Sequence, residues 1–116
     1  MAHVPVLRQR DNLFVTLPED FDDDTARQLL SDILERIGQT GSKGIVVDIS
    51  ALEIVDSFLG RIVADIANCA SVLDAETVVC GMRPAVAITL VELGMEFPKV
   101  AFSMDIEDAL DMLSGA

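Results

Sequence analysis

Apolar and polar positions along the chain follow two alternating patterns. Short apolar runs, typical of strands, are separated by longer stretches in which apolar residues recur every three or four positions, typical of helices. The runs predict strands at residues 4–7, 13–17, 45–49, 77–80 and 100–102. The periodic stretches predict helices at residues 25–37, 56–73 and 84–94, and a last helix after Ser103.

The order of these elements predicts the fold class. Strands that alternate with helices imply a mainly parallel sheet. The first two strands flank a polar turn at residues 8–12 and predict a hairpin, with Pro5 suited to an edge strand. The run at 45–49 is apolar except for Asp48, which suits a strand covered on both faces. We therefore expect an α/β fold, with a mixed, mainly parallel sheet of about five strands and about four helices.

Helix ends carry their own signals. Three aspartates at 22–24 precede the first helix, where carboxylates cap the free amides and favour the positive end of the helix. This capping role is a more common use of such a cluster than metal binding. Gly38 and Gly41 are expected to end that helix. Pro84 suits the first turn of the third helix, which Gly94 closes, and Ser103 is expected to cap the last helix.

Composition narrows the class of partner. The chain has 116 residues, of which 51% are hydrophobic and 4% aromatic, so we expect one domain (residues 1–116) with an aliphatic core. The formal charge of -12 disfavours nucleic acid and anionic membranes and favours a basic protein surface. No stretch is apolar enough to span a membrane, and the first ten residues lack a signal-peptide pattern, so we expect a cytoplasmic protein.

The usual signatures of catalysis are missing from the sequence. His3 is its single histidine, and it contains no phosphate-binding loop, dinucleotide fingerprint or Cys/His metal spacing. Cys69 and Cys80 lie in apolar surroundings and are expected to be reduced core thiols, although the sequence leaves a disulfide open. We expect a protein that is not an enzyme and has no cofactor or metal.

Asp56 and Ser57 stand where the second helix should begin, after a buried strand and a short loop. A serine there commonly caps the helix. It is also well placed to accept a phosphate, because the helix terminus tolerates negative charge. The sequence alone leaves both roles open.

A second informative run covers residues 81–94. Met82 and Arg83 follow a parallel strand, so we expect them at the same end of the sheet as Ser57. They form either a partner-contact surface or a plain turn. The hypothesis of a contact surface gives a partner-binding set of Asp56, Ser57, Phe58, Met82 and Arg83. Thr89 is expected to be an ordinary helix residue rather than a second phosphorylation site.

One rival interpretation involves Asp48. Receiver domains hold magnesium and accept phosphate with acids that end adjacent strands. Glu19 and Asp20 would supply the other acids, but Lys99 precedes the last strand, whereas receivers need a lysine after it. The alternative is that the Asp48 carboxylate organises its loop by accepting from backbone amides toward Ser50 and Leu52.

The signature loop of STAS domains, the anti-sigma-factor-antagonist family, is similar to two neighbouring segments of this chain, Asp48-Ile49-Ser50-Ala51-Leu52 and Val55-Asp56-Ser57-Phe58-Leu59-Gly60. The resemblance covers nearly the whole chain. Together with residues 81–94, it extends to the single-domain scaffolds of the bacterial stressosome (the RsbS type). Simpler antagonists of the family usually have a second serine where this chain has Phe58.

This resemblance implies a non-catalytic role with defined partners. Such scaffolds assemble with RsbR-type STAS proteins into a large particle and sequester an RsbT-type serine kinase. The kinase then phosphorylates the scaffold serine, here Ser57, and leaves, and a serine phosphatase resets the scaffold. The alternative within the family is a monomeric antagonist that binds an anti-sigma kinase.

Overall fold

The computed structural model describes residues 4–52 and 57–114. These residues form five strands and four helices, so the prediction of an α/β fold is confirmed. In chain order the elements are β1 (Leu7–Gln9), β2 (Asn12–Thr16), α1 (Asp23–Thr40), β3 (Gly44–Asp48), α2 (Ser57–Val72), β4 (Glu76–Cys80), α3 (Pro84–Glu92), β5 (Val100–Ser103) and α4 (Ile106–Ser114).

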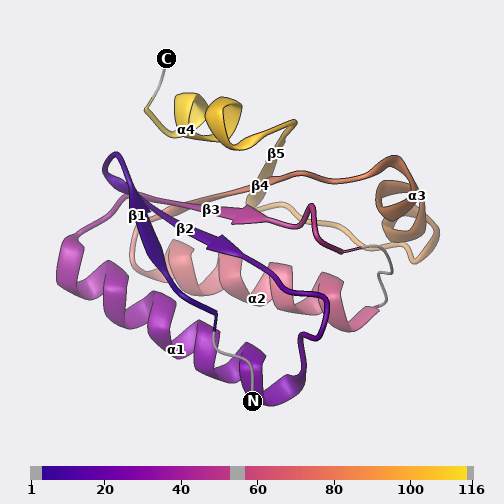
Figure 1. Ribbon diagram of the computed structural model, residues 1–116, viewed down its shortest axis with the longest axis horizontal. Coiled ribbons are helices and arrows are strands. Elements are labelled where there is room, and N and C mark those ends of the chain that lie inside the picture. The colour runs from indigo at the N-terminus through magenta and orange to yellow at the C-terminus, as the bar shows by residue number, and fades with distance from the viewer. Residues whose placement is uncertain (1–3, 53–56, 115–116) are drawn as a thin grey trace.

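The strands form one sheet in the order β1-β2-β3-β4-β5. β1 and β2 pair antiparallel as a hairpin, and each later pair is parallel, which confirms a mixed, mainly parallel sheet. Helices α1 and α2 cover one face, α4 lies over the other, and α3 lies beyond the carboxyl end of the central strands (Figure 1). The β3–α2 and β4–α3 connections therefore leave the sheet at the same end.

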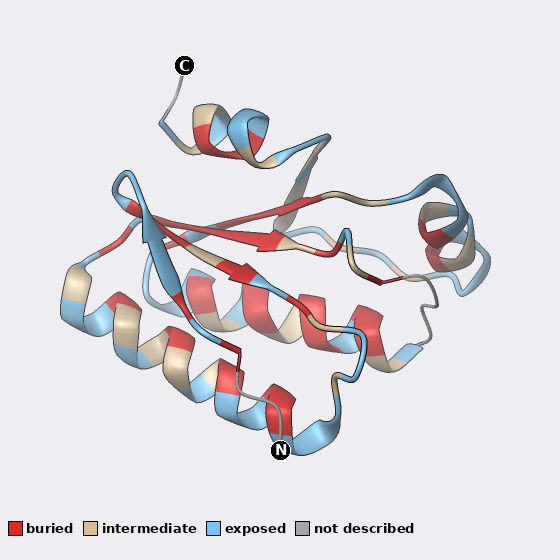
Figure 2. Cartoon of the chain, viewed as in Figure 1, coloured by how far each residue is buried: buried red, intermediate tan, exposed pale blue. Residues whose placement is uncertain are grey.

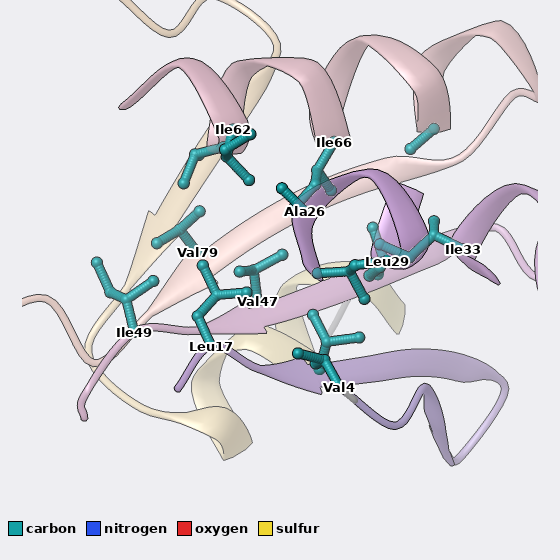
Figure 3. Packing of buried hydrophobic residues seen from close by; sticks show 14 of the residues in the cluster. Val4, Leu17, Ala26, Leu29, Ile33, Val47, Ile49, Ile62, Ile66 and Val79 are labelled. Carbon is teal, nitrogen blue, oxygen red and sulfur yellow. The ribbon is translucent and has the colours of Figure 1, made fainter. Parts of the chain in front are cut away.

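The core is divided by the sheet. Ile45 and Val47 belong to the larger apolar cluster, which includes the inner faces of α1 and α2, whereas Val46 belongs to the smaller cluster under α4. All three side chains are completely buried, as expected for a strand covered on both faces. Buried residues line the inner faces of α1 and α2 in Figure 2, and Figure 3 shows the aliphatic packing between them and the sheet.

The caps of α1 match the predictions from the sequence in part. Asp22 Oδ1 accepts a hydrogen bond from the Thr25 amide at 2.8 Å, as predicted for an N-cap carboxylate. Gly41 ends the helix with φ 67°, and its N–H donates to the Ile37 carbonyl at 2.8 Å. The prediction that Gly38 also ends the helix is wrong, because α1 continues through Thr40.

Two other boundaries differ from the predictions. Ser103 does not cap the last helix: it is the final residue of β5, paired with Cys80, and Asp105 Oδ1 accepts from the Asp108 amide at 2.8 Å instead. The first strand begins at Leu7 rather than at residue 4. Val4 is buried without joining the ladder, since the tight hairpin aligns Leu7 with Phe14 and leaves the preceding segment unpaired.

Candidate functional site

Ser57 is the first residue of α2, and its side chain is exposed. The first amides of a helix have no partner within the helix and give its amino terminus a partial positive charge. A hydroxyl in this place is accessible to another protein and lies in a field that favours an added anion. Asp56 lies outside the described residues.

The loop that leads from β3 toward Ser57 is organised by Asp48. Asp48 Oδ1 accepts a hydrogen bond from the Ser50 amide at 2.9 Å, which confirms its predicted loop-organising role. The Leu52 amide donates instead to the Ile49 carbonyl at 3.1 Å, so the expectation that Asp48 reaches toward Leu52 is not met. These two bonds fix the backbone of residues 48–52, directly after the strand.

A glycine brings the next connection against this loop. Gly81 follows β4 with φ 76°, a conformation that residues with a Cβ rarely adopt. A Cβ at this position would lie 2.6 Å from Asp48 Oδ1 and 2.9 Å from the Ser50 Cβ. The β3–α2 and β4–α3 connections therefore pack directly together.

Phe58 contacts a third connection, the one between β2 and α1. Its partly buried ring contacts that of Phe21, with centroids 6.4 Å apart and an interplanar angle of 47°. Phe21 lies between β2 and α1, in an acidic segment that includes exposed Glu19 and Asp20. Sequence reasoning missed Phe21, because a lone aromatic residue in a polar loop has no periodicity.

Met82 and Arg83 lie at the same end of the sheet as Ser57, as predicted from the parallel pairing of β3 and β4. Met82 is partly buried and packs against the core, so only part of its side chain is available to a partner. Arg83 is exposed in an extended conformation at the N-cap of α3. Their role in partner binding stays a prediction. In α3 itself, the Thr89 hydroxyl donates to the Ala85 carbonyl at 3.0 Å, a common arrangement for helical threonine.

Gly60 belongs to the signature segment, but sequence reasoning gave it no packing role. It lies in the first turn of α2, and the sulfur and methyl carbon of Met95 occupy the space that a Cβ at this position would need. Leu90 of α3 lies close by, with its Cδ2 3.6 Å from that Cβ position. The absence of a side chain at residue 60 thus lets the segment after α3 approach the helix that carries Ser57.

The two cysteines, Cys69 in α2 and Cys80 at the end of β4, both have a raised pKa. Burial, with smaller contributions from the charges of Asp48 and Asp105, raises the pKa of the Cys80 thiol to about 12. Burial also raises the pKa of Cys69. Both cysteines are free thiols. Within residues 4–52 and 57–114, no three His, Cys, Asp or Glu side chains are grouped closely enough to hold a metal ion.

Comparison with known proteins identifies the family. Residues 3–109 match the STAS domain model. The chain belongs to the STAS domain family. It is 28% identical over 107 residues to the RsbT co-antagonist protein RsbRD of Bacillus subtilis (strain 168), a match that covers 91% of this chain and 38% of that protein. A match to RsbRA of the same organism, at 23% identity, covers 93% of this chain and 41% of the relative. The chain thus spans about two fifths of the length of these curated relatives.

Solved structures agree with this assignment. An RsbS protein of Moorella thermoacetica with a serine-to-glutamate substitution is 36% identical, with a TM-score of 0.84 and coverage of 98% of this chain and 97% of that one. A chain of a solved stressosome structure is 37% identical to this one, with a TM-score of 0.84 and coverage of 96% of both chains. The unphosphorylated anti-sigma factor antagonist SpoIIAA, at 18% identity and a TM-score of 0.73, shares the fold. The predicted resemblance to STAS proteins of the stressosome is therefore confirmed. None of the helices in the described residues is long and apolar enough to cross a membrane.

Proposed function

We propose that this STAS protein is a non-catalytic stressosome scaffold that sequesters an RsbT-type serine kinase and releases it when Ser57 is phosphorylated. The observation that carries the proposal is the exposed position of Ser57 at the start of α2, beside three packed connections. Similarity to an RsbS protein over nearly the full length of both chains supports it.

The names of the relatives support part of the partner set in this proposal. The curated matches are named RsbT co-antagonist proteins, and a solved stressosome chain aligns with nearly the whole of this one. We assign to this chain an RsbR-type STAS co-scaffold, self-association in a large assembly, an RsbT-type kinase and a resetting serine phosphatase. The kinase would contact the surface around Ser57, Phe58, Met82 and Arg83, together with Asp56.

The chemical step is a phosphoryl transfer supplied by the kinase and ATP. The Ser57 Oγ bonds to the γ-phosphorus, the bond from that phosphorus to the bridging oxygen of ADP breaks, and the hydroxyl proton leaves to a base of the kinase. The product carries about -1.5 to -2 charge at neutral pH. Because Ser57 is exposed whereas Leu59 and Ile62 of the same helix are buried, this charge enters at the surface and leaves the core packing intact.

Mass spectrometry after incubation with the kinase and ATP tests the assignment. We expect a single phosphate on Ser57 and none on the Ser57→Ala variant. Thr89 provides an internal control, because the peptide that contains it should stay unmodified. Equal labelling of wild type and Ser57→Ala would refute the role of Ser57.

A monomeric antagonist that binds an anti-sigma kinase is the second candidate, since the fold is shared with SpoIIAA. Gel filtration with an RsbR-type partner separates the two functions. A scaffold should elute with that partner as a very large species, whereas an antagonist should elute as a small one. Phe58, which stands in place of a second serine, favours the scaffold.

A further inference from the structure

We propose that Arg61 holds the phosphate on Ser57, a role that rests on the proposed phosphorylation of that serine. Ser57 and Arg61 are four residues apart on α2, and both side chains are exposed. Residues with this spacing lie on the same face of a helix, with Cβ atoms about 5–6 Å apart. The pair therefore presents a serine hydroxyl and a guanidinium side by side at the surface.

The direction of the helix favours this contact. The Cα–Cβ bonds of a helix tilt toward its amino terminus, so a long side chain at residue 61 extends over the turn that contains residue 57. An acidic group followed by a basic group four residues later is also the more favourable order of such a pair. A guanidinium can bind two phosphate oxygens at once.

Arg61 has no competing partner among the described residues, because it forms neither an ion pair nor a hydrogen bond there. Asp65, one turn further along α2, forms no ion pair with it. Arg36, by contrast, donates to the Val6 carbonyl at 3.0 Å. Four other basic side chains are paired with aspartates: Arg8, Arg10, Arg27 and Lys43.

Charged groups of both signs lie at this end of the sheet, and Arg83, exposed at the N-cap of α3, is a second cation there. The β2–α1 connection (residues 17–22), which contains Glu19, Asp20 and Asp22, approaches α2 through the contact between Phe21 and Phe58. Glu96 follows Met95, which packs on Gly60. The negative charges of these carboxylates disfavour a phosphate on Ser57. Arg61 offsets that repulsion locally and stabilises the dianionic form of the phosphate.

A titration by phosphorus NMR measures this effect. Phosphoserine is installed at position 57 during translation, so the measurement does not depend on the kinase. We expect the second pKa of the phosphoserine, ordinarily about 6, to be higher by about 0.3 in Arg61→Gln than in the otherwise unchanged chain. That shift corresponds to about 0.4 kcal/mol at 1.36 kcal/mol per unit.

Two variants separate a specific contact from a general change in charge. Arg27→Gln removes the same charge from an exposed site on α1, where Arg27 pairs with Asp24, and should leave the phosphoserine pKa unchanged. Arg61→Lys keeps the charge, so its phosphoserine pKa should stay close to that of the otherwise unchanged chain. Identical titrations of Arg61→Gln and the unchanged chain, or an equal shift in Arg27→Gln, would overturn the proposal. Failure of the kinase to label Ser57 would instead refute the proposed function.

Discussion

The ring of Phe21 packs on that of Phe58, next to Ser57, with the two centroids 6.4 Å apart. This contact joins the acidic β2–α1 connection to the first turn of α2. Aromatic pairs of this kind contribute about 0.5–1.5 kcal/mol beyond the area that they bury. The contact therefore holds the start of α2 in place against the neighbouring connection.

A double-mutant cycle should detect this coupling. We expect Phe21→Ala and Phe58→Ala each to lower the free energy of unfolding, and the double variant to lose about 0.5–1.5 kcal/mol less than the sum. Urea unfolding of the four proteins provides the measurement. Strictly additive losses would show that the two rings stabilise the fold independently.

A negative charge at Ser57 should weaken retention of the kinase without unfolding the domain. An unmatched charge at an interface costs about 2–5 kcal/mol, so Ser57→Asp should bind the kinase about 30- to 4,000-fold less tightly. Ser57→Asn is the matched neutral control and should retain it. Melting curves of the two variants should agree, and equal retention of the kinase by both would contradict the proposed switch.

Removal of the Thr77 hydroxyl should stabilise the protein. Thr77 Oγ1 is buried in β4 and has no hydrogen-bond partner among the described residues. Replacement by valine keeps the shape and removes the cost of the unsatisfied hydroxyl, so Thr77→Val should raise the free energy of unfolding by about 1 kcal/mol. Ser42→Ala should have the opposite effect on stability. The Ser42 hydroxyl is a satisfied donor, within hydrogen-bond distance of the Asp11 carbonyl (3.0 Å) and the Gly44 carbonyl (2.9 Å). This substitution should destabilise the fold by about 1 kcal/mol or more.

The Cys80 thiol should resist modification in the folded protein. With a pKa raised to about 12, only about one Cys80 in ten thousand is a thiolate near pH 8. Iodoacetamide should therefore label partly exposed Cys69 first, and Cys80 only after denaturation. Because the pKa is raised on folding, the stabilisation from this group is full below about pH 9 and declines as the pH rises toward 12. Rapid labelling of native Cys80 would contradict this account.

The cap of α1 should make stability sensitive to acid. The amide and hydroxyl of Thr25 lower the pKa of the Asp22 carboxyl below its ordinary value of 3.8. A lowered pKa in the folded state means that the stabilisation is present above pH 3.8 and declines as the pH falls through the folded value. At pH 7, Asp22→Ala should melt at a lower temperature than Asp23→Ala, which removes the same charge without the capping bond. The difference between these variants should shrink in acid.

Much of the site could be expected from the chain alone. The start of α2 at Ser57 and of α3 at Pro84 follows from local signals, namely apolar periodicity and a proline in a first turn. The error at the last helix shows where such signals fail. Ser103 and Asp105 are both suitable caps, and the choice depends on β5, whose pairing with Cys80 holds Ser103 in the strand and leaves the cap to Asp105.

The sequence by itself determined the alternation of strands and helices, the carboxyl end of the sheet at which the site lies, and the STAS signature around Ser57, because each depends on residues close together in the chain. Only the tertiary structure decided that Phe21 reaches Phe58 and that Gly81 packs against the loop of Asp48. These contacts join segments that are distant in sequence. Their formation depends on how the strands align and how closely the backbones approach, which no local pattern specifies.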